Sequence, residues 1–220
     1  MDSKDVLEIL RNCGALITDS HIVYTSGRHG DTYINKDAIY PHTAVTSKLC
    51  KEIAEWFEDF GCEIVVAPAI GGVILSQWTA YHLNAPTSVN RVGEVLGIYA
   101  EKSDDGQTFE FHRSYDKLIP GKKVLVVEDV LTTGGSVQKV VEAVRRLNGK
   151  VEGVGAICNR GGVTRKDIGD VPELYALLDI NLDSFPEAEC PLCAKHIPIN
   201  IEVGKGREYL HQKGQLVLGS

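Results

Sequence analysis

The chain has 220 residues, of which 43% are hydrophobic and 24% charged, as in an average globular domain that can bury a core. Lys and Arg total 23 against 30 Asp and Glu, a net charge of −7. This charge argues against broad binding to nucleic acid or anionic membranes, because phosphate contacts need a basic surface. The sequence contains no apolar run of about 18 residues, so no transmembrane helix is predicted. Its first residues lack the basic and then apolar segments of a signal peptide. Six cysteines are too few for a disulfide scaffold. We therefore expect a soluble, cytoplasmic protein with a single domain over residues 1–220.

The first part of the chain alternates between patterns typical of helices and patterns typical of strands. In chain order we expect an amphipathic helix over 3–16 and two short strands around a turn over 22–39. A helix over 43–60, a buried strand over 63–67 and an apolar helix over about 71–83 are expected to follow. Gly61 is expected to end the helix before it. Residues 1–40 are interpreted as a small N-terminal hood over a core at 41–180.

Residues 122–158 read as a strand, a loop, a helix and a second strand. Val124–Val127 is an apolar, β-branched run that is expected to be buried on both faces of a parallel sheet. A polar loop is predicted over 128–136, followed by a helix with one apolar face and Gly149 as its stop. This βαβ unit, together with the earlier strand and helix, predicts an α/β fold with a doubly wound, mostly parallel sheet flanked by helices.

Two segments depart from this pattern. Residues 100–120 contain a turn-rich polar stretch and close with Pro120-Gly121, which predicts a long, mobile hairpin or loop of the kind that often serves as a lid. Residues 181–220 mix Pro, Cys and Gly and are expected to form an irregular C-terminal extension.

The loop after the Val124–Val127 strand carries the clearest chemistry. Ligands of open α/β sheets bind at the carboxyl ends of the strands, where this loop falls. Its second half offers hydroxyls and backbone amides at a helix N-terminus, which together favour a phosphate. Its first half offers two adjacent carboxylates that can accept hydrogen bonds from sugar hydroxyls. A phosphorylated sugar is the ligand that this order implies, bound by Glu128, Asp129, Val130, Leu131, Thr132, Thr133, Gly134, Gly135 and Ser136.

Val124–Ser136 resembles the phosphoribosyl pyrophosphate (PRPP) signature of type I phosphoribosyltransferases. The resemblance extends over most of the chain and is greatest to the orotate phosphoribosyltransferases. It implies the type I phosphoribosyltransferase fold with a hood and a mobile hairpin. It also implies a pyrophosphate loop, a base site and two catalytic residues. These are Ala69, Ile70, Gly71 and Gly72 for the loop; Thr25, Arg28, Tyr33, Ile34 and Arg160 for the base; and Lys102 and Asp129 for catalysis.

The resemblance implies transfer of the phosphoribosyl group of PRPP to orotate, with Mg²⁺ held mainly by PRPP oxygens and water. It also implies a homodimer in which the 100–120 hairpin reaches the partner's site. The chain departs from the family pattern at Thr25, at Gly71 and in an acidic hairpin where Lys102 is the one matching lysine. Two alternatives therefore stay open: salvage of another purine or pyrimidine base, and a non-catalytic regulator that senses PRPP or nucleotides.

Cys190 and Cys193 form a lone C-x-x-C, with His196 three residues further on. Zinc would need a further ligand, for which Cys158 is the remaining cysteine with any appeal. A zinc site, a redox pair and structural thiols are the three interpretations of this motif.

Overall fold

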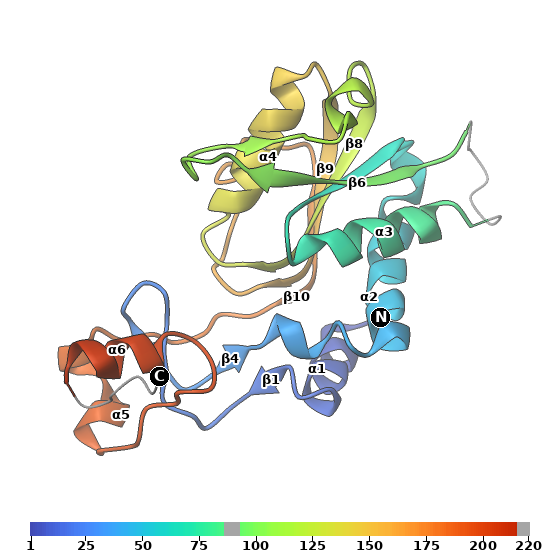
Figure 1. Ribbon diagram of the computed structural model, residues 1–220. Coiled ribbons are helices and arrows are strands. Elements are labelled where there is room, and N and C mark those ends of the chain that lie inside the picture. The colour runs from blue at the N-terminus through green and yellow to red at the C-terminus, as the bar shows by residue number, and fades with distance from the viewer. Residues whose placement is uncertain (86–92, 215–220) are drawn as a thin grey trace.

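The computed structural model describes residues 1–85 and 93–214, and its centre is a six-stranded sheet (Figure 1). The strand order is β10-β9-β8-β5-β6-β7, and every neighbouring pair is parallel except β6 and β7. The bounds are β5 Ile64–Pro68, β6 Leu96–Lys102, β7 Phe109–Glu110, β8 Lys123–Leu131, β9 Lys150–Asn159 and β10 Leu174–Asp179. The predicted α/β class with a mostly parallel sheet is confirmed.

Helices cover both faces of the sheet, because successive residues of each strand point to opposite sides. On β8, Leu125 and Val127 belong to a core with helices α1 (Ser3–Asn12), α2 (Thr43–Trp56) and α3 (Gly72–Leu83). Val124 and Val126 belong to a second core with α4 (Gly135–Arg146) and the β7 hairpin. All four of these β8 side chains are fully buried, so the sheet has an apolar core on each side.

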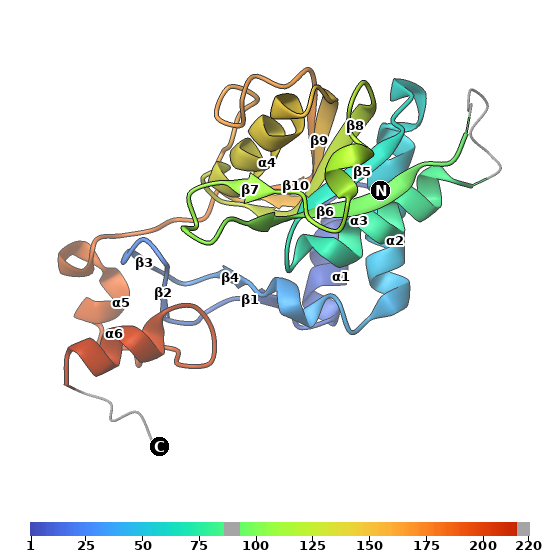
Figure 2. The same cartoon turned by 45° about the horizontal axis from the view of Figure 1, so that its top comes forward.

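A smaller layer combines the N-terminal hood with the C-terminal segment (Figure 2). Its hood strands form two antiparallel pairs: β1 (Leu16–Ile17) with β4 (Tyr33–Ile34), and β2 (Ile22–Val23) with β3 (His29–Gly30). The short helices α5 (Pro191–Ala194) and α6 (Gly206–Gln212) lie beside β2 and β3. Backbone hydrogen bonds join His29 to Phe185 in both directions and Asn200 to the carbonyl of His21.

The remaining elements are short 3₁₀ turns. They are η1 (Lys36–Ala38), η2 (Glu58–Phe60), η3 (Tyr115–Lys117) and η4 (Glu187–Glu189). No helix in residues 1–85 and 93–214 is long and apolar enough to cross a membrane.

Three boundary predictions need correction. The loop expected to begin at Glu128 begins later, because β8 continues to Leu131 and keeps pairing with β9 through this stretch. The α4 helix is followed by Asn148 in the left-handed conformation rather than by a left-handed Gly149. Gly149 is instead needed for space, since a Cβ there would lie 2.6 Å from Cγ1 of Val144.

The 100–120 segment contains the expected hairpin, but Phe109 and Phe111 anchor it in the core. The last six residues of the expected 181–220 extension lie outside the described residues, as does the Gly219-Ser220 end.

Candidate active site

The candidate site lies where β5, β8 and β9 end. These strands are parallel neighbours, so the segments that follow them meet at one edge of the sheet. The segments are the pyrophosphate loop after β5, the phosphate loop at 132–136 after β8, and the turn that carries Arg160 after β9. The strand order therefore brings together three of the segments that the sequence assigned to one site.

Asp129 is the charged centre of this edge. Its side chain is 3% exposed and accepts a hydrogen bond of 2.7 Å from the hydroxyl of Tyr40. Lys36 Nζ lies 3.1 Å from Asp129 Oδ2, so a cation neutralises the buried carboxylate. Burial tends to lower the pKa of Lys36, but the carboxylate of Asp129 more than offsets this and raises it. Burial, and then the charge of Asp129, raise the pKa of Tyr40. Both partners therefore keep their protons beside Asp129.

Glu128 occupies the preceding strand position and lines a different space. It is 9% exposed, and it borders a small cavity of about 50 Å³ that is otherwise formed by the phosphate loop and the start of α4. The alternation of a strand explains why Glu128 lies toward α4 while Asp129 meets Lys36 and Tyr40. Burial, and then the neighbouring Asp129 charge, raise the pKa of Glu128 well above its ordinary value of 4.5.

Two glycines let neighbouring segments pack closely against the phosphate loop. Gly134, at the N-cap of α4, has a φ of 75°, and a Cβ there would lie 2.6 Å from Cγ2 of Ile168. A Cβ on Gly161 would lie 1.6 Å from the carbonyl oxygen of Thr132. The loop is thus held between α4 and the turn after β9, with the amides of the helix N-terminus at the cavity that Glu128 lines.

The pyrophosphate loop is held against the same carboxylate. The Ala69 amide donates to the carbonyl of Ala100 at 2.7 Å, which ties the start of the loop to β6. At Gly71, a Cβ would lie 2.6 Å from Asp129 Oδ2 and 2.7 Å from Lys36 Nζ. The absence of a side chain at this position therefore lets the loop approach Asp129, and Ile70 beside it is 89% exposed.

A cavity of about 520 Å³ opens beside the phosphate loop. Its lining combines that loop, the turn after β9, the hood and the segment after β10: Tyr24, Thr25, Ser26, Thr132, Thr133, Arg160, Gly161, Leu182 and Ser184. The guanidinium of Arg160 lies 4.9 Å from the ring centre of Tyr24 and 5.8 Å from that of Tyr33. This stacking leaves its N–H donors available in the plane of the group for a carboxylate.

The turn that carries Arg160 is fixed by its neighbour. The side-chain amide of Asn159 donates to the carbonyl of Val163 and accepts from its amide, both at 3.0 Å. The Arg160 amide donates to the carbonyl of Leu131 at 3.0 Å. Arg160 is therefore positioned by backbone contacts to β8 and to its own turn.

The structure brings some of the residues predicted for the base site to the 520 Å³ cavity and places others elsewhere. Thr25 and Arg160 line the cavity, and Tyr33 lies beside Arg160. Ile34 is 4% exposed and packs in the core, because strand alternation on β4 turns it away from Tyr33. The guanidinium of Arg28 donates to the hydroxyl and carbonyl of Ser184, so it fastens the hood to the segment that lines the cavity.

Lys102 is exposed at the end of β6, where it pairs with Phe109 in the hairpin. It lines neither the 520 Å³ cavity nor the phosphate-loop cavity. In the same hairpin, Arg113 forms an ion pair with Glu101 and lies 5.5 Å from the ring centre of Tyr99. The predicted catalytic role of Lys102 stays a prediction.

The sequence reasoning gave two residues of this site too little weight. From the sequence, Lys36 is a rival of Arg28 as a cation for the base pocket and is more readily explained as a surface charge, while nothing indicates Tyr40. Both lie on or next to the short η1 turn, which has no periodic pattern to reveal its orientation. Their contacts with Asp129 join segments 89 or more positions apart in the chain.

The Cys190–Cys193 motif belongs to a separate cluster in the small layer. One ligand atom each from His21, His29, Cys190 and Cys193 lies within 4.8 Å of the others. His196 and Cys158 are outside this group: Cys158 is fully buried in the core on β9. The partners suggested for the two cysteines by the sequence were therefore wrong.

The strands of this parallel sheet end at a phosphate loop and at a second, glycine-rich loop, with a carboxylate between the two. These features define a protein that binds a phosphorylated sugar at its strand ends. The phosphoribosyl transferase domain family matches residues 35–181. Curated relatives named orotate phosphoribosyltransferase include one from Chlorobium phaeobacteroides, 36% identical over 91% of this chain and 95% of its own length. Another, from Desulforamulus reducens, is 35% identical over 90% of this chain and 95% of its own length.

Among solved structures, the orotate phosphoribosyltransferase of Mycobacterium tuberculosis H37Rv in complex with Fe(III) dicitrate has a TM-score of 0.63 to this chain. It is 22% identical and covers 82% of this chain and 97% of its own. The chain belongs to the phosphoribosyltransferase family and has its type I fold.

Proposed function

We propose that this chain is an enzyme that transfers the 5-phosphoribosyl group of PRPP to orotate, giving orotidine 5′-phosphate and pyrophosphate in pyrimidine biosynthesis. The relatives that share 35–36% of its sequence over about nine-tenths of its length are named for this activity. The observation that carries the proposal is the position of Arg160, which lines a cavity directly beside the phosphate loop.

PRPP fits the order of groups along the sheet edge. Its 5-phosphate would bind the amides and hydroxyls of 132–136, which form a cavity at the N-terminus of α4. Its pyrophosphate would bind the amides of 69–72, at the start of α3. The ribose would then lie between these loops, with its hydroxyls toward Glu128 and Asp129.

Orotate would occupy the 520 Å³ cavity. A planar guanidinium donates two parallel hydrogen bonds to a carboxylate, which matches the carboxylate that distinguishes orotate from uracil. Thr25 and Ser26 contribute hydroxyls to the same lining, so the ring's carbonyl and imide groups would also have partners.

In the reaction, a ring nitrogen of orotate gives up its proton to solvent and forms a bond to the anomeric carbon, while the bond from that carbon to the pyrophosphate oxygen breaks. Configuration inverts, positive charge develops on the ribose ring, and the electron pair of the broken bond leaves with pyrophosphate. The chain's contribution is to hold the two reactants in line and to stabilise the charge that develops on pyrophosphate. Lys102, from the hairpin, would provide a cation for that charge and help to exclude water.

Asp129 would orient the ribose rather than act as a base. Its carboxylate already accepts from Tyr40 and pairs with Lys36, and ribose hydroxyls can donate to its remaining lone pairs. Lys36 would in this way place a cation beside the buried carboxylate near the anomeric carbon.

Magnesium is the proposed cofactor. Among the described residues, the one group of metal-ligating side chains is the His and Cys cluster of the small layer, while the strand ends offer the two carboxylates of Glu128 and Asp129. This donor set suits an ion that takes most of its oxygens from PRPP and water. When bound, Mg²⁺ would neutralise part of the pyrophosphate charge.

We propose a homodimer in which the β6–β7 hairpin completes the partner's site, because the exposed Lys102 lines neither cavity of its own chain. A cytoplasmic location is also proposed. All six cysteines are free thiols, which is typical of a reducing compartment.

A turnover assay tests this function. The purified chain is incubated with PRPP, Mg²⁺ and, in separate reactions, orotate, uracil, adenine, guanine, hypoxanthine or xanthine, and pyrophosphate release is followed. Release with orotate alone is expected. Release with a different base would move the function to salvage, and PRPP binding without any conversion would favour a sensor.

A further inference from the structure

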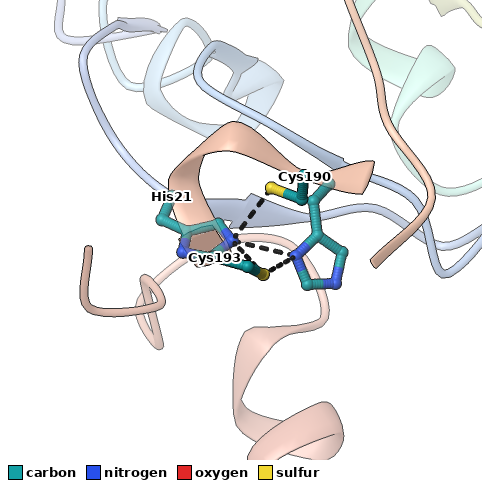
Figure 3. Close-up of side chains that lie close together, drawn as sticks. His21, Cys190 and Cys193 are labelled. Carbon is teal, nitrogen blue, oxygen red and sulfur yellow. Dashed lines mark hydrogen bonds between the residues drawn. The ribbon is translucent and has the colours of Figure 1, made fainter. Parts of the chain in front are cut away.

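The His and Cys cluster has the composition of a structural zinc site. Its four residues come from two distant parts of the chain. His21 directly precedes β2 and His29 begins β3, while Cys190 is the N-cap of α5 and Cys193 lies within that helix. His21 and Cys190 are each 2% exposed and His29 is fully buried. Figure 3 shows the sulfurs of Cys190 and Cys193 facing the imidazole of His21.

The proton on His21 is fixed by a backbone contact. Its Nδ1 lies 2.7 Å from the carbonyl oxygen of Ile197, which can only accept, so Nδ1 carries the hydrogen. The other nitrogen, Nε2, therefore presents a bare lone pair to the cluster. A backbone carbonyl on the far nitrogen is the usual partner of a histidine that binds a metal.

Hydrogen bonds to this lone pair cannot satisfy all of the groups that surround it. Nδ1 of His29 lies 2.9 Å from His21 Nε2, and the sulfurs of Cys190 and Cys193 lie 3.7 and 3.6 Å from the same atom. One neutral imidazole nitrogen accepts a single hydrogen bond, so at most one of these three neighbours can donate to it. A cation at the centre would bind all four groups at once.

The distances suit tetrahedral coordination. Zinc bonds of about 2.0–2.1 Å to nitrogen and about 2.3 Å to sulfur place ligand atoms about 3.6 Å apart for a nitrogen and a sulfur, and about 3.3 Å apart for two nitrogens. Three of the four nitrogen–sulfur distances here are 3.4, 3.6 and 3.7 Å, and all four ligand atoms lie within 4.8 Å of one another. The two nitrogens, at 2.9 Å, would separate by about 0.4 Å.

We propose that His21, His29, Cys190 and Cys193 bind one Zn²⁺ ion in a closed, structural site. Two imidazoles and two thiolates in a tetrahedral arrangement favour zinc over harder cations such as Mg²⁺ or Ca²⁺. Four protein ligands leave no open position for a substrate, which separates this site from catalysis.

The site would fasten the wall of the 520 Å³ cavity. The turn between its two histidines carries Tyr24, Thr25 and Ser26, and the segment leading to its cysteines carries Leu182 and Ser184, all of which line that cavity. The ion would thus hold the hood to the C-terminal segment where these two parts of the chain meet.

The test begins with the metal content of the full chain, purified without chelators. Elemental analysis is expected to find about one zinc ion per chain. The Cys190→Ser/Cys193→Ser double variant is expected to lose it, because hydroxyls are poor ligands for zinc. Cys13→Ser is the matched control, since Cys13 is a partly exposed free thiol outside the cluster, and it should keep the metal.

A second measurement needs no cluster variant and so does not depend on the variant folding. The wild-type chain is stripped of metal with a chelator and titrated with Co²⁺, which is expected to give the intense visible bands and the thiolate charge-transfer band of a tetrahedral sulfur-ligated site. Stripping should lower the melting temperature, and Zn²⁺ should restore it.

Three results would overturn the proposal. They are a wild-type chain that contains no zinc and gives no tetrahedral Co²⁺ spectrum, a double variant that retains the metal, and a Cys190–Cys193 disulfide found by mass spectrometry in the freshly purified protein. None of these measurements uses turnover, so they are independent of the proposed transferase activity.

Discussion

At the residue scale, Arg160 is the side chain on which recognition of orotate depends. It lines the cavity, and the rings of Tyr24 and Tyr33 hold its guanidinium. Arg160→Ala is expected to raise the KM for orotate about 100-fold, since a bidentate charge-assisted pair contributes about 3 kcal/mol. The KM for PRPP should change far less. Steady-state kinetics with each substrate varied in turn measure this.

Arg207→Ala is the control for that variant, because Arg207 is exposed on α6 and lines neither cavity. An Arg160→Ala enzyme with an unchanged KM for orotate would show that the carboxylate binds elsewhere.

Glu128 gives the site a pH-dependent stability. Burial, and then the charge of Asp129, raise its pKa in the folded chain above the ordinary value of 4.5. For an acid whose pKa is raised by folding, the stabilising contribution is complete below the ordinary pKa and is lost as pH rises through the raised one. We therefore expect Glu128→Gln to lose less stability than the wild type as pH rises.

Melting temperatures of the substrate-free protein between about pH 5 and about pH 9 measure this difference. Glu142→Gln, on the exposed side of α4, should follow the wild type. Parallel curves for Glu128→Gln and the wild type would mean that Glu128 titrates as an ordinary carboxyl.

At the element scale, the phosphate loop depends on the turn after β9. Gly161→Ala would place a methyl group 1.6 Å from the Thr132 carbonyl oxygen, so the two segments must separate. The variant is expected to weaken PRPP binding at least tenfold, which corresponds to about 1.4 kcal/mol. Isothermal titration with PRPP and Mg²⁺ measures the effect.

Gly153→Ala separates this effect from a general loss of packing. Gly153 lies within β9 rather than in the turn after it, and a Cβ there would lie 2.5 Å from the ring of Phe57 in the core. This control should lower the melting temperature and leave the affinity of the folded protein for PRPP close to wild type. Equal affinities for both variants would contradict the role assigned to the turn.

The sequence predicted the elements of the sheet better than the contacts between them. The β8 strand is marked by a short, continuous apolar run, and the apolar face of α4 repeats with the period of a helix, so both could be located directly. The strand ended later than expected, because Glu128 is polar yet still pairs with β9, as do Val130 and Leu131 beyond it. Parallel strands then bring the loops at 69–72 and 132–136 to one edge, which made that part of the site predictable.

Contacts that depend on the small layer could not be predicted in this way. Its strands are two residues long, too short for a period to show which side chains face the cavity and which, like Ile34, pack in the core. The pairing of Lys36 with Asp129, and of the histidines with Cys190 and Cys193, depends on how the hood docks. These pairs are separated by up to 172 positions along the chain, so no local pattern indicates them.

At the scale of the whole molecule, the proposed dimer makes each active site a product of two chains. If the hairpin acts across the interface, a dimer of one Lys102→Ala chain and one Asp129→Asn chain contains one site with both native side chains. Each variant alone is expected to be nearly inactive. The mixed dimer is expected to have about half of wild-type activity, because one of its two sites is intact.

The mixing is done by co-expression with two different tags, and the mixed dimer is isolated before assay. Co-expression of two differently tagged Asp129→Asn chains is the control and should stay inactive. An inactive mixed dimer would show that Lys102 serves its own chain.

The central claim is that this molecule selects orotate from among the nucleobases. One reaction tests it most directly: the wild-type chain with PRPP, Mg²⁺ and equimolar orotate, uracil, adenine, guanine, hypoxanthine and xanthine, with the nucleotides formed identified by mass spectrometry. We predict orotidine 5′-phosphate as the product, with the other five bases unconverted. A different nucleotide as the main product, or no nucleotide at all, would contradict the claim.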